Sequence, residues 1–421
     1  MVEPLPASAE PGADGLVRTT GTVLALKALS AALVGVVAIV TARQLGPSGR
    51  GALVLLYAVA SFALIACGMG VNVAAKVHLV SPTSSVTTSD YLGLSTALSA
   101  LQVVVCLLLA ITLLPRVHVH LTPAEFLVFG ALGGSMLAQY LLLELLVAHG
   151  FIAVAATVDA AGSGVQLAIV LGLVAAGTRS FIPFVSALAI ANALQILLTL
   201  VVIKRVGLPI MPTYQRSHWA ALLQTGLPGI VVGLAQVLTF RLDRYLIGLL
   251  LTPGAVGVYS VSATAPELIR LLPLALSQPV IHRLASGAAV PEHFRRTRLQ
   301  CLAVLAAIVV LGAVLAPFAV RELFGPAYRG AVTPLRVLLL AEFGIAIFYL
   351  DGGALTAVDR VRSAATAATV ALVLVVVGDL ILIPRYGILG AAWASVAAYS
   401  TMGVTAHVLL RRHQSARRAS S

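Results

Sequence analysis

Ionisable side chains that interrupt long apolar runs are the residues of this sequence with the clearest chemical potential. Arg241, Asp243 and Arg244 lie in one run, and Glu267 and Arg270 lie in the next. If these runs cross a membrane, each charge costs roughly 2.5–3.5 kcal/mol at the bilayer centre, so such side chains usually face a bundle interior or a wet cavity. The five residues are therefore the first candidates for a binding site.

The arginines favour an anionic ligand. Arg241 and Arg244 are three residues apart and share a face of a helix, whereas Asp243 points about 100° away from Arg244. A planar guanidinium can bind phosphate through two parallel hydrogen bonds. Alternatively, Asp243 neutralises one arginine and the other side chains extend to the membrane surface. Lys27, the basic group of the first apolar run, is open to the same two interpretations.

Acidic side chains could couple transport to protons or cations. Arg270 follows Glu267 on the same helix face, which admits either a self-contained ion pair or a substrate- or proton-linked role. Glu342 lies near the middle of its apolar run, where a lone buried carboxylate could carry a proton. Asp159 is a third candidate, although its position nearer the end of a run favours a hydrogen bond between helices.

Motifs for covalent or metal chemistry are absent from the sequence. It contains no G-x-S-x-G, H-E-x-x-H or Walker motif. His118 and His120 are the only close histidine pair, and a solvated loop explains them better than a metal site. Cys67, Cys106 and Cys301 lie in apolar runs without metal-binding spacing. We therefore expect no catalytic residue, no metal site and no cofactor.

Composition identifies the setting of these residues. Of the 421 residues, 60% are hydrophobic and 10% are charged, whereas soluble domains carry about 25% charged residues. This excludes a soluble enzyme, a nucleic-acid-binding protein and a disordered chain, and the continuous apolar runs exclude a β-barrel. The net charge of +12 is consistent with arginine-rich cytoplasmic loops.

A membrane-spanning helix needs about 20 mainly apolar residues. We expect twelve spans, at residues 21–42, 51–75, 91–114, 124–148, 151–176, 181–203, 219–250, 254–280, 299–319, 334–350, 363–383 and 388–410. The seventh and eighth are the least regular, because charged residues interrupt them. Lys and Arg are more frequent on the side of the connections that also holds both termini, which predicts a plasma-membrane protein with cytoplasmic N- and C-termini.

Two connections repeat each other. Residues 45–51 read LGPSGRG and residues 251–257 read LTPGAVG, and the same offset of 206 residues brings Arg179 onto Arg385. A repeat of six spans in one orientation predicts two lobes related by an axis along the membrane normal. The predicted division is a cytoplasmic N-terminal tail (1–20), an N-lobe (21–212), a C-lobe (213–410) and a basic cytoplasmic tail (411–421).

Four stretches carry a resemblance to a known family. Residues 42–51 (ARQLGPSGRG) resemble the A-R-x-L-G-P-x-x-x-G signature of polysaccharide-biosynthesis flippases. These flippases belong to the multidrug/oligosaccharidyl-lipid/polysaccharide (MOP) exporter superfamily. Residues 242–259, 323–328 (LFGPAY) and 384–395 (PRYGILGAAWAS) are similar to later stretches of that family, in the same order and spacing.

The resemblance implies an all-α polytopic membrane protein of about 12 transmembrane helices in two six-helix lobes, with a MATE-like V-shaped architecture. Spans one, two, seven and eight would line a central cavity. The cargo would be a polyprenyl-diphosphate-linked oligosaccharide, moved from the inner to the outer leaflet by alternating access for cell-surface polysaccharide biosynthesis. The protein would then be a transporter and not an enzyme. Its partners would be this lipid, membrane lipids and a polysaccharide polymerase or glycosyltransferases, with no nucleic acid.

The resemblance also directs attention to particular side chains. Arg43 and Arg50 fall in the first signature, and Asp243 and Arg244 fall in the second stretch. The predicted substrate-binding residues are Lys27, Arg43, Arg50, Arg241, Asp243, Arg244, Glu267 and Arg270, and the predicted ion-coupling residues are Glu267, Glu342 and Asp159.

Other functions stay open at this point. A MATE-type drug/cation antiporter of the same superfamily is weakened by the absence of Asp and Glu from the first span, but Asp159 or Glu267 could serve it. A membrane enzyme of glycan assembly would usually need a sizeable outer loop, and no connection is that long. A scaffold that recruits assembly enzymes through the arginine-rich tail is a third alternative.

Overall fold

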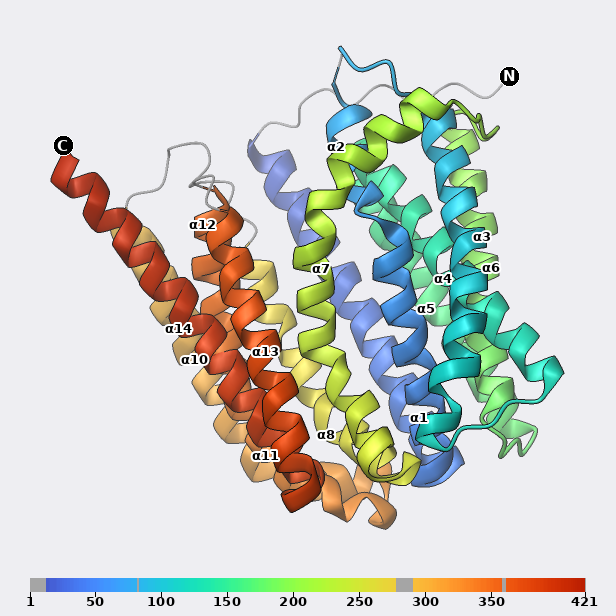
Figure 1. The fold of residues 1–421 in the computed structure, drawn as a ribbon, viewed down its shortest axis with the longest axis vertical. Helices are drawn as coiled ribbons and strands as arrows, with labels where there is room; N and C mark the ends of the chain where they lie inside the picture. The colour runs from blue at the N-terminus through green and yellow to red at the C-terminus, as the bar shows by residue number, and fades with distance from the viewer. Residues whose placement is uncertain (1–12, 82, 278–290, 358–360, 421) are drawn as a thin grey trace. The chain divides into compact units, whose positions relative to one another are not determined.

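The structure is a computed structural model that describes residues 13–81, 83–277, 291–357 and 361–420, which form helices with no β-strand among them (Figure 1). The α-helices are α1 (Ala13–Gly68), α2 (Val71–His78), α3 (Thr88–Leu113), α4 (Pro123–Ala148), α5 (Ile152–Ala175), α6 (Ile182–Arg205), α7 (Arg216–Leu250), α8 (Pro253–Ile269), α10 (Pro291–Ala319), α11 (Val332–Ile347), α12 (Gly353–Ala357), α13 (Val361–Tyr386) and α14 (Ile388–Ser420). Short 3₁₀ or π turns adjoin them at η1 (Pro115–Val117), η2 (Val320–Phe324), η3 (Pro326–Ala331) and η4 (Phe348–Gly352).

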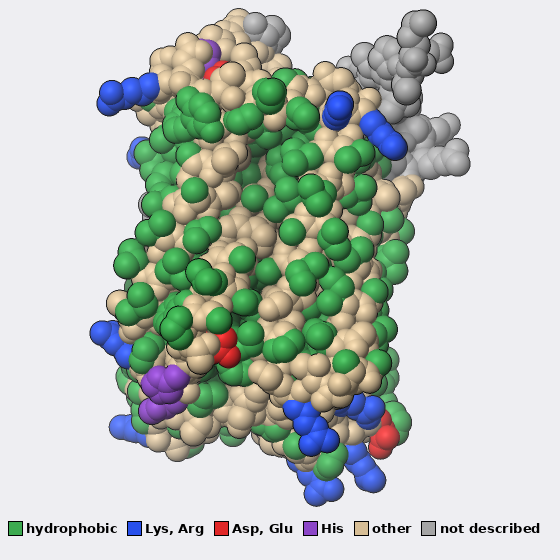
Figure 2. Space-filling model, turned by 90° about the vertical axis from the view of Figure 1, so that its right-hand side faces the viewer, with side chains coloured by type: hydrophobic (Ala, Val, Ile, Leu, Met, Phe, Trp, Pro, Cys, Tyr) green, Lys and Arg blue, Asp and Glu red, His purple; other side chains and the backbone are tan. Residues whose placement is uncertain are grey.

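Within the described residues, nine helical stretches are long and apolar enough to cross a membrane. The first, Gly21–His78, covers the first two predicted spans. Helices α7 and α8 lie over the irregular seventh and eighth predicted spans but are not among the nine, so these two spans stay predictions. The end of the predicted eighth span, 278–280, lies outside the described residues. Figure 2 shows the apolar surface that such helices present, with hydrophobic side chains over the middle of this face and most Lys and Arg near its two ends. The predicted all-α polytopic membrane fold is confirmed.

The long helix α1 contains one sharp break, at Gly46. Its backbone there has φ 67° and ψ −179°, a combination that a residue with a side chain rarely adopts. Pro47 follows, and proline is well suited to the first turn of a helix because its N–H is not needed there. The break therefore ends the first predicted span and starts the second at the Leu-Gly-Pro of the signature.

The chain forms two compact units, which are described separately. Unit 1 comprises Met1–Leu45 and Leu56–Leu234, and unit 2 comprises Gly46–Leu55 and Ala235–Ser421. Helix α7 contributes to both. Of the predicted N-terminal tail, residues 1–12 lie outside the described residues, and α1 begins at Ala13. The predicted division into lobes at residue 212 stays a prediction.

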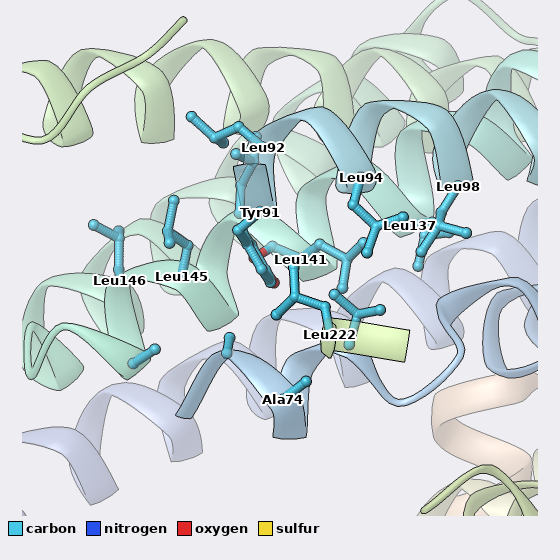
Figure 3. Close-up of a cluster of buried hydrophobic side chains, with 14 of the residues drawn as sticks. Ala74, Tyr91, Leu92, Leu94, Leu98, Leu137, Leu141, Leu145, Leu146 and Leu222 are labelled. Atoms are coloured by element: carbon cyan, nitrogen blue, oxygen red, sulfur yellow. The ribbon is translucent and has the colours of Figure 1, made fainter. Parts of the chain in front are cut away.

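Unit 1 has a core of leucines from α3 and α4 (Figure 3). Tyr91 is fully buried in this cluster, and its hydroxyl donates a hydrogen bond to the Leu141 carbonyl at 2.9 Å. One residue earlier, Asp90 forms a capping box with Thr87 at the start of α3. The Asp90 carboxylate also accepts a 2.6 Å hydrogen bond from the Thr213 hydroxyl, which ties the connection before α7 to the start of α3.

Unit 2 packs α11, α13 and α14 around a core rich in alanine. Buried charges join three of its helices at one end. The carboxylate of Asp351, in the π turn η4, is fully buried and lies 3.0 Å from Arg298 Nη1 of α10 and 2.7 Å from His407 Nδ1 of α14. Because a buried carboxylate needs a charged or hydrogen-bonding partner, these contacts hold the three helix ends together.

Candidate functional site

The strongest concentration of buried charge in the described part of unit 2 lies between α7 and α8. The Arg244 guanidinium of α7 forms an ion pair with the Glu267 carboxylate of α8. Arg244 Nη1 also donates to the Phe240 carbonyl at 3.2 Å. The Arg244 side chain is 5% exposed, whereas the Glu267 side chain is 38% exposed. The guanidinium is thus fixed in place, while its partner faces open space.

A second ion pair lies beside the first and has the opposite exposure. Arg270, directly after α8, donates to Glu342 of α11 through Nη2 at 2.8 Å and through Nε at 3.3 Å. Its guanidinium carbon lies 4.4 Å from the centre of the Phe240 ring and 5.6 Å from that of Tyr399. Glu342 is only 1% exposed. Bidentate pairing and two aromatic rings therefore hold Arg270 rigidly.

Asp243 is the third buried carboxylate of the site. Its Oδ2 accepts a 2.7 Å hydrogen bond from the Tyr259 hydroxyl of α8, and its Oδ1 accepts one of 2.7 Å from the Arg244 backbone N–H. Both oxygens are therefore bonded, which satisfies a side chain that is only 4% exposed. The Asp243 carboxylate and the Arg244 guanidinium also attract each other electrostatically, so the alternative in which Asp243 neutralises an arginine stays open.

Two further arginines act on the same carboxylate. Arg241, one turn before Arg244, interacts electrostatically with Glu267, and so does Arg50 from the segment of α1 that belongs to unit 2. Glu267 therefore lies among the charges of four arginines, the fourth being Arg270. A small pocket lined by Arg244, Glu267 and Arg270 opens beside the two ion pairs. We call Arg50, Arg241, Arg244 and Arg270 the arginine cluster.

Two expectations about the acidic residues are wrong. Glu342 is not a lone carboxylate, because it holds Arg270. Glu267 and Arg270 do not form a self-contained pair, because each has a partner on another helix. Arg270 follows the last residue of α8 and keeps a helical backbone, but its guanidinium extends to Glu342 of α11 instead of pairing with Glu267. The proposed coupling roles of Glu267 and Glu342 stay predictions.

The other predicted residues lie in unit 1. Lys27 and Arg43 are exposed on α1. Asp159 of α5 accepts a 3.2 Å hydrogen bond from the Ser30 hydroxyl of α1, and Ser30 also bonds Ser163 at 2.8 Å. Asp159 thus forms the hydrogen bond between helices that its position near the end of an apolar run favours. Roles of these residues in binding or coupling stay predictions.

Sequence reasoning missed the aromatic side chains of the site. Tyr259, Phe240 and Tyr399 orient the charged groups, but aromatic residues inside apolar runs usually belong to a hydrophobic core. Asp379 of α13 is fully buried, and neither carboxylate oxygen has a hydrogen-bond partner in the described part of the chain. The usable signals were the charged residues that interrupt the seventh and eighth apolar runs and, for Arg50, the resemblance of its stretch to the family signature.

The described residues were also compared with the requirements of a metal site. The described ranges contain no group of three or more His, Cys, Asp or Glu side chains able to hold a metal ion. The site is instead suited to electrostatic binding of an anion, through guanidinium groups that present planar pairs of donors.

Replacing Arg270 with alanine is expected to destabilise unit 2 strongly. Removing one partner of a buried ion pair costs about 3–5 kcal/mol, because the other charge stays buried without compensation. Thermal unfolding of the purified protein in detergent measures the change. Arg321→Ala is the matched control, since Arg321 is 71% exposed and its pair with Glu322 at 3.6 Å lies at the surface. Equal melting temperatures for the two variants would contradict the structural role assigned to Arg270.

The fold of this chain is similar to that of membrane transporters of known structure. No curated protein matches the chain. The structure is similar to the lipid II flippase MurJ in an inward closed conformation, with a TM-score of 0.76 and 12% identity over 92% of this chain and 86% of that one. It is also similar to an inward-facing MATE multidrug resistance transporter of the MOP superfamily, with a TM-score of 0.74 and 13% identity over 93% of this chain and 96% of that one.

A MOP superfamily transporter from Pyrococcus furiosus matches as well, with a TM-score of 0.56 and 12% identity over 95% of this chain and 96% of that one. At these identities the likeness concerns the fold. The sequence itself supplies the family, because the family model described as polysaccharide biosynthesis protein matches residues 16–284, more than half of the chain. The chain is therefore a multi-pass membrane protein that has the fold of MOP superfamily transporters and belongs to the polysaccharide biosynthesis protein family.

Proposed function

We propose that this protein is a flippase that moves a polyprenyl-diphosphate-linked oligosaccharide across the membrane by alternating access. The single observation that carries the proposal is the arginine cluster, which brings the charges of four guanidinium groups to bear on Glu267 in unit 2, with Arg244 and Arg270 lining the pocket there. The diphosphate of such a lipid carries two negative charges. A cluster of fixed guanidinium groups offers it charge-assisted, bidentate hydrogen bonds.

The physical need for a protein is clear. Unsatisfied polar groups each cost several kcal/mol in hydrocarbon, so a glycan with a diphosphate does not cross a bilayer unaided. Arg244 of α7 is buried, and the other three members of the arginine cluster are partly buried, so they supply compensating charge inside unit 2. The lipid tail can stay in the bilayer while the head group uses this route.

A drug/cation antiporter fits the site less well. A cationic drug needs an available carboxylate, but the three acidic groups of the pocket already have partners. Glu267 pairs with Arg244, Glu342 pairs with Arg270, and Asp243 accepts two hydrogen bonds. The excess of arginine over carboxylate also repels a cation.

The membrane and orientation belong to the proposal. The bias of Lys and Arg among the connections supports a plasma-membrane protein with both termini in the cytoplasm. Transport would then run from the inner to the outer leaflet, where a polysaccharide polymerase or glycosyltransferases could use the lipid.

Reconstitution tests the proposal. Purified protein in vesicles containing a fluorescent polyprenyl-diphosphate oligosaccharide is expected to make the labelled head group accessible from the opposite side. A membrane-impermeant quencher measures the exposed fraction over time, and vesicles without protein give the background rate. Transport of a fluorescent cation instead of the lipid would favour the antiporter, and a chemically altered lipid in the extract would favour an enzyme of glycan assembly.

A further inference from the structure

Glu267 occupies the position that an anionic ligand of the arginine cluster would take. It is the carboxylate paired with Arg244, and the charges of Arg241 and Arg270 also act on it. Its side chain is 38% exposed, compared with 1% for Glu342 in the neighbouring pair. Glu342 lies behind Arg270, whereas Glu267 lies between Arg244 and open space.

The balance of charge around Glu267 also favours Glu267 over Glu342 as the group that a ligand replaces. With all groups ionised, the four arginines of the cluster exceed the carboxylates Asp243, Glu267 and Glu342 by one charge. Without the contribution of Glu267, the excess is two, which matches a diphosphate diester. Asp243 and Glu342 are nearly fully buried and hold Tyr259 and Arg270, so neither can leave without breaking a structural contact.

We propose that Glu267 is an internal counterion that competes with the diphosphate for Arg244, so that substrate binding displaces the Glu267 carboxylate and its return helps to release the substrate. This inference rests on the proposed function and identifies the residue that sets the affinity of the same site. In the empty transporter Glu267 neutralises Arg244. In the loaded transporter a phosphate takes its place, and the exposed Glu267 side chain turns toward the open space of the pocket.

The arrangement answers a requirement of transport. A site of four guanidinium groups without a competitor would hold a diphosphate too tightly to let it go, and a transporter must bind weakly enough to release its cargo. An ion pair with one buried and one exposed partner is suited to exchange. The buried guanidinium keeps its geometry through its bond to the Phe240 carbonyl, while the carboxylate can rotate away.

A binding measurement with a substrate fragment tests the proposal. The probe is a farnesyl diphosphate whose terminal phosphate is esterified with a fluorophore, a diphosphate diester without sugars, added to the purified full-length protein in lipid nanodiscs. Glu267→Gln keeps the size of the side chain and removes its charge, so it is expected to lower the Kd at least tenfold and to slow probe dissociation. Glu267→Ala is a second variant with the same expected direction, should the glutamine protein be poorly folded.

Glu322→Gln is the matched control, because it removes the same charge from unit 2 at an exposed position outside the pocket lining. We expect its Kd to change less than threefold. Equal tightening by Glu322→Gln would reduce the effect to the net charge of the protein and overturn the proposal, as would an unchanged or raised Kd in Glu267→Gln. If the wild-type protein does not bind the probe, the proposed function fails. If the wild-type protein binds the probe and Glu267→Gln does not bind it more tightly, only this inference fails.

Discussion

Arg244→Ala is expected to reduce transport of the labelled diphosphate lipid about a hundredfold in reconstituted vesicles. The Arg244 guanidinium is 5% exposed and lies at the pocket, with its direction fixed by Phe240. Truncating one partner of a buried charge pair costs about 2–5 kcal/mol, and each 1.4 kcal/mol corresponds to a factor of ten. Arg244→Lys is expected to retain only part of the rate, because an ammonium keeps the charge but loses the planar pair of donors.

Two controls separate binding from folding. Arg321→Ala removes an exposed arginine from unit 2 and is expected to transport at the wild-type rate. Arg244→Ala leaves Glu267 without its ion-pair partner, which could destabilise the protein, so the double variant Arg244→Ala/Glu267→Gln is measured beside it. The double variant is expected to regain thermal stability and to stay inactive. A folded Arg244→Ala protein with wild-type transport would remove the arginine cluster from the transport route.

Sequence reasoning reaches the residues of the site but not their pairing. Hydropathy is sufficient to place the membrane-spanning helices, because about 20 apolar residues per span leave few alternatives. Charges that interrupt such spans must face protein or water, which singles out Arg241, Arg244, Glu267 and Arg270. In the structure Arg244, Glu267 and Arg270 line one pocket of unit 2, and Arg241 acts electrostatically on Glu267.

The partners of these charges depend on how helices pack, which spacing along one helix does not determine. Arg270 pairs with Glu342, 72 residues later, and not with Glu267, three residues earlier. Arg244 pairs with Glu267, 23 residues later, rather than with the adjacent Asp243. The same-face rule identifies side chains that could meet on one helix, but it does not show that a neighbouring helix supplies the partner, as α11 does for Arg270. Long-range pairs of this kind need the tertiary structure.

The internal repeat in the sequence corresponds to a contact in the structure. The two matching connections, residues 45–51 and 251–257, meet each other in unit 2. A Cβ atom on Gly51 would lie 1.7 Å from the Pro253 carbonyl oxygen, and one on Gly257 would lie 2.0 Å from the Pro47 carbonyl oxygen. Equivalent residues of the repeat therefore make the same contact in both directions. The crossing of the second part of α1 with α8 requires glycine at both positions.

Gly51→Ala is consequently expected to lower the melting temperature of the purified protein sharply, and Gly51→Leu is expected to yield little folded protein. The added methyl group meets backbone atoms, which cannot rotate aside as a flexible side chain can, so the two helices must separate. Gly254→Ala is the matched control, three residues before Gly257 on the same helix. The nearest atom to its added Cβ would be the Ser48 hydroxyl at 3.4 Å, an ordinary contact.

The reciprocal contact makes a sharper prediction for the pair of glycines. Once Gly51→Ala has pushed the helices apart, Gly257→Ala meets less resistance, so the double variant is expected to lose less stability than the sum of the single variants. Additive losses would mean that the two glycines pack independently. Arg50 immediately precedes Gly51 and acts on Glu267 and Arg244, so separation of the helices is also expected to withdraw one charge from the arginine cluster. Transport by any folded Gly51→Ala protein should therefore fall more than transport by Gly254→Ala, and equal rates would show that the crossing does not position Arg50.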